Sequence, residues 1–458
     1  MSVPPRRIPL TPSAPGRRGV LAATGLVALL GSAGCSYLNG DSSSDTGGGD
    51  AVQLTFRIWS DDTVAAAYES SFAAFTEKNP GITVSIEQVP WDSYFDTLRT
   101  DIAAGAVADA FWVNAYNFAA YADNDDLVDI TEELPDAGKD WEDSAVELYT
   151  RDGSLWGVPQ LIDGSKVLFY NKDLVEAAGI DVESLAWDPT ASDDSLRQAA
   201  RALTVDDEGR TAADEGFDPS TTTQYGFNAA YDFDAILGNF VGSNGGLYQK
   251  DGAYVFGEDP RTVEAIEYVV DLVDREHVTP AAADTNADGS YSLTQFQAGK
   301  LALFESGAYN LSTIAESTDA DWGLAPIPAG PKGRISVTNA IIAAGSAASA
   351  HPEELRTLLA WLSTAEGLAP LGEAGAIIPA VRSAQQSYVD FWSAKDIDVT
   401  AFTEGLADGA LRNDPVPNAQ AASADLESAY HEIFAGRSTD IPAALQEAQD
   451  HANDQIAG

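Results

Sequence analysis

Aromatic residues stand beside short polar residues at several places where the sequence predicts a strand end or a crossing between two lobes. An aromatic ring offers a flat apolar surface, while Asp, Asn and Ser offer hydrogen-bonding groups. Sugars have the complementary chemistry, apolar C–H faces with a rim of hydroxyl groups, so this pairing is typical of carbohydrate binding. The candidate ligand-binding residues are Trp59, Ser60, Asp61, Asn114, Tyr116, Asp163, Tyr231, Phe233, Gly307, Tyr309, Asn339 and Arg382.

Each of these residues also has an ordinary structural explanation. Core packing is the commoner reason for an aromatic residue, and both Trp59 and Trp112 could be wholly buried. Asp61 could be only a helix cap, and Asp163 could be only a turn residue. Asn339 and Arg382 are candidates because they lie near the later crossings.

Motifs for catalysis and nucleotide binding are missing from the sequence. It contains no Gly-x-Ser-x-Gly elbow, P-loop, Gly-x-Gly-x-x-Gly or Cys-x-x-Cys. The four histidines, at positions 277, 351, 431 and 451, lie in helical or helix-edge contexts. We therefore expect no enzyme activity and no cofactor, although an exported glycosidase that uses two carboxylates stays open on composition alone.

One acidic stretch resembles a calcium-binding loop. Asp284, Asn286, Asp288 and Gly289 follow the spacing of an EF-hand, but Gln295 stands where a bidentate Glu is required. A neutral Gln supplies a single oxygen, which should reduce the affinity for calcium. An acidic surface turn explains the stretch equally well, and we expect no metal there.

The start of the chain reads as an export signal. Residues 1–34 combine four arginines, a short apolar run and small residues before Cys35, the one cysteine in the sequence. Arg17 and Arg18 resemble a twin-arginine signal, and Cys35 after Ser-Ala-Gly resembles a lipoprotein box whose thiol receives diacylglycerol and acyl chains such as palmitate. Residues 36–50 are rich in Gly, Ser and Asp and predict a flexible tether. The alternative is ordinary secretion with cleavage elsewhere.

Composition limits the choice of partners. The formal net charge is −46, so nucleic acid would be repelled. Acidity mainly indicates solubility and does not show that the ligand is cationic. The chain of 458 residues is longer than one hydrophobic core usually serves, and two lobes are expected.

The first part after the tether alternates between strand and helix patterns. Strands are expected at 53–59, 82–86 and 110–113, and helices at 64–75 and 91–104. This βαβαβ order predicts a mostly parallel sheet flanked by helices. Ligands bind at the carboxyl ends of the strands in such sheets, which is why residues that follow strands are candidates.

The stretch 156–180 reads as strand, turn at 163–165, strand at 167–170 and helix at 174–178, and the turn is the expected crossing between lobes. Further crossings are expected at 328–333 and 375–379. The other expected elements are helices at 187–203, 260–273, 292–300, 351–362, 406–436 and 441–452, strands at 301–304, 322–328 and 340–344, and an acidic loop at 206–220. The expected segments are 1–34 signal peptide, 35–50 lipidated cysteine and tether, 51–163 and 331–378 lobe 1, and 164–330 and 379–458 lobe 2.

Several blocks in this order are similar to family 1 extracellular solute-binding proteins, the maltose- and oligosaccharide-binding receptors of bacterial ABC importers. The blocks are FTEKNPGI (75–82), Gly-x-Pro (157–159) with LFYNKDL (168–174) and AGI (178–180), FQAGKLALFESGAY (296–309) and WGLAPIP (322–328). Ala108, Leu303 and Tyr309 depart from the usual Pro, Met and Trp.

The resemblance implies a two-lobed α/β fold of the periplasmic-binding-protein type, with each lobe a mostly parallel sheet flanked by helices. It implies a monomeric substrate-binding lipoprotein on the outer face of the membrane that delivers a sugar, an oligosaccharide by our interpretation, to ABC permease subunits. The family's stacking aromatic falls at Tyr309. The same fold with a polyol, glycerol phosphate or polyamine as ligand stays open as an alternative.

Overall fold

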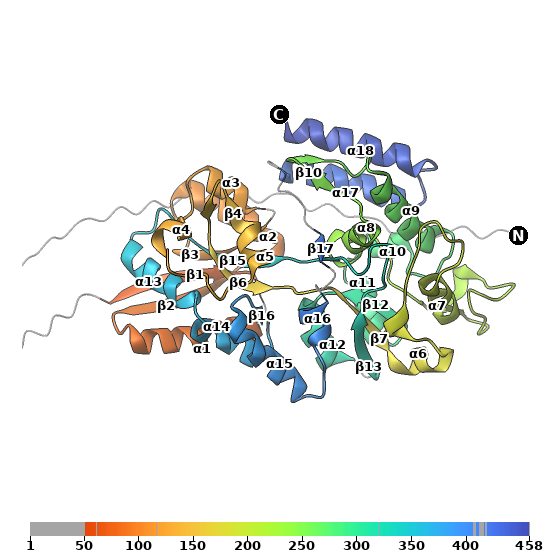
Figure 1. Cartoon of the computed structure of the whole chain (residues 1–458), viewed down its shortest axis with the longest axis horizontal. Coiled ribbons are helices and arrows are strands. Elements are labelled where there is room, and N and C mark those ends of the chain that lie inside the picture. Colours follow the sequence, from red (N-terminus) through yellow and green to blue (C-terminus); the bar gives the residue numbers. More distant parts are fainter. Residues whose placement is uncertain are drawn as a thin grey trace, which may run out of the picture. The chain divides into compact units, whose positions relative to one another are not determined.

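The computed structural model is built around a six-stranded and a three-stranded sheet (Figure 1) and describes residues 51–457 except 61, 116, 319, 406–408, 412–415, 417 and 418. The described residues belong to one compact unit. The predicted signal peptide, Cys35 and the tether lie outside the described residues, as do Asp61 and Tyr116. None of the described helices has the length and apolar character that a membrane crossing requires.

The six-stranded sheet, with its helices, forms lobe 1. Its strand order is β16-β6-β15-β3-β1-β2. The predicted βαβαβ run is confirmed, because β1 pairs in parallel with both β2 and β3. The remaining pairs are antiparallel, so the sheet as a whole is mixed, and the expectation of a mostly parallel sheet is wrong for lobe 1 beyond β1 to β3. The strands are β1 Val52–Ile58, β2 Ile82–Gln88, β3 Ala110–Asn114, β6 Val158–Ile162, β15 Ala340–Gly345 and β16 Ile378–Pro379.

Helices cover both faces of this sheet. Figure 1 shows α1, α14 and α15 below the sheet and α2, α3 and α4 above it. The elements are α1 Asp62–Lys78, α2 Trp91–Ala104, α3 Phe118–Asp123, α4 Ile130–Glu133, α5 Asp143–Tyr149, α13 Pro352–Leu362, α14 Ala365–Glu373, α15 Gln385–Ser393, and the small hairpin β4 Thr150–Arg151 with β5 Ser154–Leu155. The predicted bounds of α2 are confirmed, since Gly105 ends the helix with φ of 64°.

The three-stranded sheet is the centre of lobe 2 and has β7 Val167–Asn171 between β12 Leu303–Ser306 and β13 Trp322–Pro326. Both pairings are antiparallel, so the expectation of a mostly parallel sheet is wrong for this lobe. The reason lies in the route of the chain, which leaves the crossing on β7 and returns toward it on β12 and β13. Val167 consequently pairs with both Ser306 and Pro326, the last residues of the returning strands.

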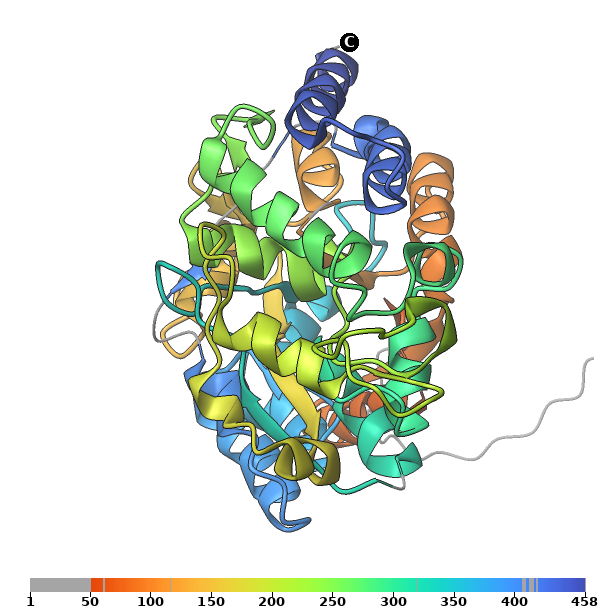
Figure 2. The ribbon, with the colours of Figure 1, turned by 90° about the vertical axis from the view of Figure 1, so that its right-hand side faces the viewer.

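Helices and short elements complete lobe 2. Figure 2 shows α17 and α18, the blue C-terminal helices, lying side by side. The helices are α6 Lys172–Ala178, α7 Ser195–Leu203, the π-helix η3 Phe233–Leu237, α8 Gly238–Asn244, α9 Pro260–Asp274, α10 Ala282–Thr285, α11 Tyr291–Gln297, α12 Leu311–Ser317, α16 Thr400–Glu404, α17 Gln420–Phe434 and α18 Ile441–Ile456. The short elements are η1 Val182–Ser184, η2 Pro219–Thr221, η4 Ala308–Asn310, β8 Val205–Asp206, β9 Thr222–Gln224, β10 Gln249–Lys250, β11 Ala253–Tyr254, β14 Ser336–Val337 and β17 Ala410–Leu411. The 3-10 helix η5 Arg382–Ala384 packs on α14 and belongs to lobe 1.

The described residues form two hydrophobic core clusters, and β7 contributes to both. Val167 and Phe169 belong to the first cluster, whereas Leu168 between them belongs to the second. This division follows from the alternation of side chains across a strand. The first cluster therefore continues from the six-stranded sheet onto one face of the three-stranded sheet, where Phe402 of α16 contacts Phe169.

Two predicted helices are too long. The expected helix at 187–203 begins only at Ser195, because Asp194 caps it by accepting a hydrogen bond from the Arg197 N–H. Trp187 is instead a core residue, with its ring 4.8 Å from those of Phe240 and Tyr268. The expected helix at 406–436 is observed as α17 from Gln420, and residues 410–411 form strand β17.

The predicted start of the last lobe 2 segment, residue 379, also differs from the packing. Helix α15 packs on α14 in lobe 1, whereas α17 and α18 pack on α9 in lobe 2. The chain therefore changes lobes after α15. The sequence predicts a crossing at 375–379, but β16 pairs with β6 there, inside lobe 1.

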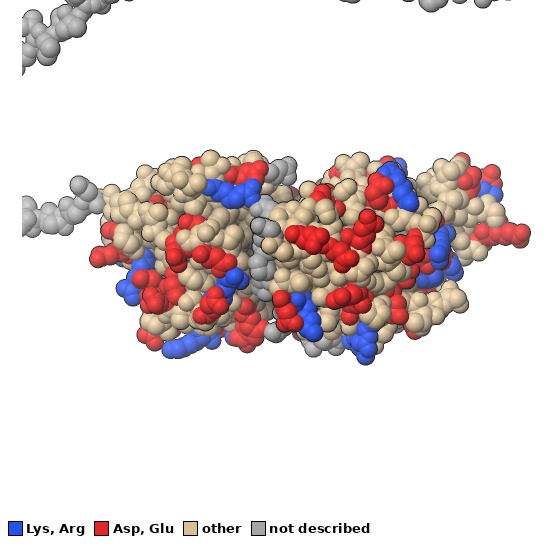
Figure 3. All heavy atoms as spheres, turned by 90° about the horizontal axis from the view of Figure 1, so that it is seen from above, with Lys and Arg blue, Asp and Glu red and all other residues tan. Residues whose placement is uncertain are grey.

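Acidic side chains are spread over the face shown in Figure 3, with Lys and Arg often next to them. Asp206, the last residue of β8, is an acidic side chain that is stabilised inside the fold. Asp206 is buried and accepts hydrogen bonds from the N–H groups of Glu208 and Arg210, at 3.0 and 2.9 Å. These hydrogen bonds outweigh desolvation and lower the pKa of Asp206 to about 2.

Candidate ligand-binding site

Several predicted site residues lie at one edge of the six-stranded sheet. Strands β1 and β3 run in parallel and end at this edge, Trp59 and Ser60 following β1 and Asn114 closing β3. The register pairs Asn114 with Ile341 and Ile162 with Ala340, so the end of β6 and the start of β15 lie there too. Asp163 and Asn339 come next in the chain, and the Asp163 N–H donates to the Asn339 carbonyl at 2.9 Å.

A buried lysine joins this edge to lobe 2. Lys166 is 0% exposed, and its Nζ lies 3.0 Å from Asp163 Oδ2 and 3.1 Å from Asp234 Oδ2. The amide of Asn339 donates to the other oxygen of Asp234, and the ring of Tyr309 lies 5.6 Å from Lys166 Nζ. We call these five residues the Lys166 cluster. It brings together three of the predicted site residues from three separate parts of the chain.

The cluster combines one lysine with two carboxyl groups. Burial alone would lower the pKa of Lys166, but the adjacent Asp163 and Asp234 raise it well above its usual value, so the ammonium form persists. One cation faces two carboxyl groups, whose side chains are 18% and 31% exposed. The exposed carboxyl oxygens can accept hydrogen bonds from hydroxyl groups of a solute.

Two glycines allow this geometry. Gly164 has φ of +65°, and a Cβ there would lie 2.4 Å from the Phe402 carbonyl, to which the Ser165 N–H donates. A Cβ on Gly307 would lie 2.3 Å from Cε1 of Tyr309. Gly307 therefore lets the Tyr309 ring lie against the backbone after β12. That ring is 51% exposed and offers a free surface to a ligand.

Aromatic residues also gather at the ends of β1 and β2. The ring of Trp59, which is partly buried, lies 5.3 Å from Trp91, 4.7 Å from Tyr94 and 5.2 Å from Trp112. Trp112 is buried, as the core-packing explanation has it, whereas Trp91 is 55% exposed. Sequence reasoning missed Trp91, although its position at the start of the helix after β2 was a usable signal.

The other predicted site residues lie outside the Lys166 cluster. Tyr231 stacks on Tyr430 at 4.6 Å, and Phe233 lies 4.3 Å from Tyr248, so both rings pack on the second hydrophobic cluster. Arg382 forms ion pairs in lobe 1, at 2.9 Å from Asp143.

Asn114, also a predicted site residue, accepts a hydrogen bond through Oδ1 from the amide of Asn117 at 2.8 Å.

Sequence reasoning also missed Lys166 and Asp234. A lysine next to an apolar strand was the available signal for a buried ion pair.

The predicted calcium-loop residues have local roles in the described chain. Asp284 lies in helix α10, and the amide of Asn286 donates to the His431 carbonyl at 3.5 Å. Asp288 accepts hydrogen bonds from the N–H and hydroxyl of Ser290, at 2.9 and 2.7 Å. Among the described residues, no group of three or more His, Cys, Asp or Glu side chains is arranged to hold a metal ion.

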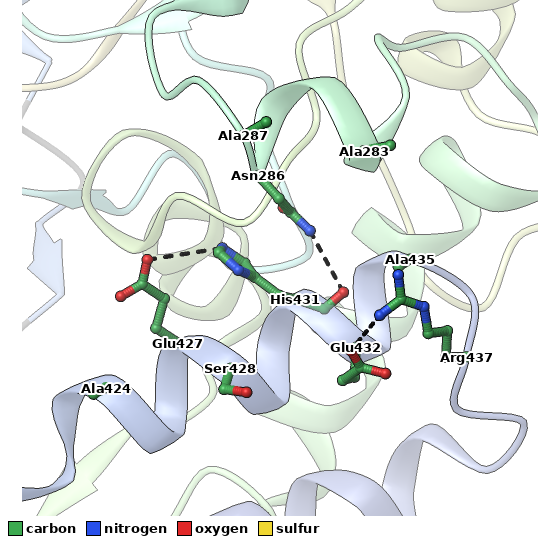
Figure 4. A pocket seen from close by; sticks show the side chains of 10 residues that line it. All are labelled: Ala283, Asn286, Ala287, Ala424, Glu427, Ser428, His431, Glu432, Ala435 and Arg437. Atoms are coloured by element: carbon green, nitrogen blue, oxygen red, sulfur yellow. Dashed lines mark hydrogen bonds and ion pairs between the residues drawn. The ribbon is translucent and has the colours of Figure 1, made fainter. Parts of the chain in front are cut away.

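A separate cavity of about 530 Å³ lies between α10 and α17 (Figure 4). Its lining combines alanines with charged residues, and His431 Nε2 lies 3.9 Å from Glu427 Oε1. A second cavity of about 360 Å³ lies beside α16 and β13 and includes Arg334. None of the predicted ligand-binding residues lines either cavity.

Comparisons with known proteins all identify binding proteins as similar to this chain. Residues 60–369 match the model of the family described as bacterial extracellular solute-binding protein. The crystal structure of UspC from M. tuberculosis is 45% identical in sequence, with a TM-score of 0.76, and the match covers 88% of this chain and 100% of that one.

Several curated relatives match in sequence. A putative binding protein of Brucella abortus is 26% identical, and the match covers 88% of this chain and 92% of that protein. The arabinooligosaccharide-binding protein of Bacillus subtilis is 23% identical over 47% of this chain and 46% of its own length.

Proposed function

Since this chain belongs to the family of bacterial extracellular solute-binding proteins, which serve ABC transporters, we propose that it binds a carbohydrate, most simply an oligosaccharide, at the Lys166 cluster. The family consists of binding proteins, so the chain is not an enzyme, and the exported glycosidase is ruled out. The observation that carries the proposal is the Tyr309 ring, 51% exposed beside Asp163 and Asp234.

The chemistry of the cluster suits a sugar. The exposed face of Tyr309 can stack on the C–H face of a pyranose or furanose ring. The carboxyl groups of Asp163 and Asp234 accept hydrogen bonds from hydroxyl groups on the ring's rim. Trp91 supplies a further exposed aromatic surface at the end of β2, so more than one sugar ring could be contacted. The relative from Bacillus subtilis, named an arabinooligosaccharide-binding protein, supports this class of ligand.

We place the protein on the outer face of the cell membrane, exported by the twin-arginine route and held by a lipid on Cys35. This part of the proposal rests on the sequence of residues 1–50. The tether would keep a monomeric receptor close to the permease subunits that accept its solute. Palmitate labelling of the protein in cells, compared between the natural chain and Cys35→Ser, tests the anchor: equal labelling would contradict it.

A cationic solute such as a polyamine is the second candidate, and the second carboxyl group of the Lys166 cluster favours it. Lys166 lies between two carboxyl groups, those of Asp163 and Asp234. A polyamine would place a second ammonium there, whereas a polyol or glycerol phosphate would use the hydroxyl-binding groups.

Thermal-shift measurements on the purified protein separate these ligands, because a solute that binds only the folded state raises the Tm. The panel contains mono- and oligosaccharides, polyols, glycerol phosphate and spermidine. We expect the largest rise with an oligosaccharide. The variant Tyr309→Ala should lose that rise, and Tyr291→Ala, a partly exposed tyrosine at the start of α11, serves as the control. A rise with spermidine alone would favour the second candidate.

A further inference from the structure

Glu305 is a buried carboxyl group next to the proposed site. It lies in β12, two residues before Gly307, and is 1% exposed. Its Oε1 accepts a hydrogen bond from the amide of Asn239 at 2.8 Å. Its Oε2 is buried without a hydrogen-bond partner, and no ion pair of Glu305 occurs among the residues that the structure describes.

Asn239 cannot supply a second donor. Its amide nitrogen donates to Glu305 Oε1 and to the Ala235 carbonyl, at 2.8 and 2.7 Å, so both hydrogens are used. Its Oδ1 accepts from the Val337 N–H at 2.7 Å, which fixes the orientation of the amide. Glu305 Oε1 therefore acts as an acceptor, and Oε2 is the atom that can carry a proton.

We infer that Glu305 is held as a neutral carboxylic acid and acts as a positioning residue for the Lys166 cluster. The inference rests on the proposed function only where it concerns binding. A buried carboxylate with one amide donor and no cation costs far more than a neutral acid in the same place. Desolvation accordingly raises the pKa of Glu305 to about 8, and Asp232 contributes to the rise.

Hydrogen bonds connect Glu305 to the cluster. Ser336 donates to Asn239 Oδ1 at 3.3 Å, and the Lys166 N–H donates to the Ser336 hydroxyl at 2.8 Å. The charged group that faces Glu305 is Asp232, which caps η3 through the Ala235 N–H.

The other contacts of Glu305 among the described residues involve uncharged groups. The carboxyl group accepts a hydrogen bond from Asn239 of α8, and the backbone N–H of Glu305 donates to Asn228 Oδ1. Leu168 of β7 lies opposite Glu305 in the sheet. Ionised Glu305 would repel Asp232 and displace η3, which also carries Asp234. The proton thus keeps Asp234 beside Lys166.

The binding test compares the wild type with Glu305→Gln, which keeps the acceptor and cannot ionise. The ligand is the sugar that gives the largest thermal shift, and isothermal titration at pH 7 and pH 9 gives the affinity. If only the protonated form binds, the wild-type affinity falls about tenfold over this range, since the pKa is near its centre. Glu305→Gln should bind equally at both pH values. Glu353→Gln, exposed on α13, is the control and should behave as the wild type does. An equal fall in Glu305→Gln would overturn the inference.

Unfolding measurements without ligand test the protonation state of Glu305 separately from binding. Folded Glu305 keeps its proton to about pH 8, whereas the unfolded chain releases it near the usual value of 4.5, so wild-type stability falls as the pH rises between these values. The Tm of Glu305→Gln should therefore rise relative to that of the wild type as the pH increases from 5 to 8.5. A constant difference would contradict the inference.

Two further outcomes are decisive. If Glu305→Gln does not fold, the carboxyl carbon shift of Glu305 in the wild type decides by NMR. A titration midpoint above pH 6.5 supports the inference, and a lower one overturns it. If no sugar binds the wild type at any pH, the proposed function fails, while unfolding still decides whether Glu305 is protonated.

Discussion

Replacing Lys166 by Met is the sharpest test of the Lys166 cluster. The substitution keeps a side chain of similar length and removes the one cation between Asp163 and Asp234. Breaking a buried ion pair by removing one partner costs about 3–5 kcal/mol. Both carboxyl groups retain some contact with water, at 18% and 31% exposure, so we expect the lower end, about 3 kcal/mol at pH 7.5.

Urea unfolding followed by circular dichroism measures this loss as the change in the free energy of unfolding. The matched control is Lys172→Met. Lys172 pairs with Asp321 at 2.8 Å, but the two side chains are 45% and 67% exposed. Such a surface pair contributes about 0–1 kcal/mol, so the control should be nearly neutral.

A second substitution checks the electrostatic origin of the loss. Without Lys166, the two carboxylates repel each other, and Asp234→Asn removes one of them. The double variant should regain about 1–3 kcal/mol relative to the sum of the single changes. Lowering the pH should have the same effect in Lys166→Met, because protonation also removes the repulsion. If Lys166→Met costs no more than Lys172→Met, or if Asp234→Asn rescues nothing, the cluster is not the ion pair described here.

Three further predictions concern the site and the acidic loop. Tyr309→Ala should weaken sugar binding about tenfold in isothermal titration, since an aromatic contact contributes about 1 kcal/mol or more, and an affinity equal to that of Tyr291→Ala would contradict this. Gly307→Ala should weaken the same binding with little change in Tm, because the new Cβ displaces the Tyr309 ring; unchanged affinity would show that the ring's position is unimportant. Asp206→Asn should lower the Tm at pH 7. The pKa of Asp206 is depressed from 3.8 to about 2, so its contribution is complete above pH 3.8 and disappears as the pH falls through 2, and a Tm difference that persists below pH 2 would refute this cause.

Local signals explain which parts of the fold could be predicted from the sequence. Helix α2 has a Gly in the left-handed conformation at its end, and the stretch from β1 to β3 alternates between clear strand and helix patterns. The expected helix at 187–203 failed because the burial of Trp187 depends on Phe240 and Tyr268, which are distant in sequence. The pairing in the three-stranded sheet also depends on the route of the chain, which no local pattern contains.

The site shows the same division. Tyr309, Asp163 and Asn339 were found individually, because each follows or precedes a strand or crossing. Their association could not be found, because it depends on Lys166 and Asp234. A lysine is normally exposed, so its complete burial becomes visible only when Asp234, which is distant in sequence, is placed beside it together with Asp163.

The position of the Lys166 cluster makes it suited to hinge closure. Asp163 follows β6 of lobe 1, whereas Asp234 belongs to η3 of lobe 2, and Lys166 lies in the crossing between the lobes. A change in the angle between the lobes must therefore alter at least one of the two ion-pair distances. A solute that bonds to both carboxyl groups acts directly on their separation, and only a contact that differs between open and closed forms can shift that equilibrium. We accordingly expect Asp234→Asn to reduce the change in the radius of gyration that the solute induces.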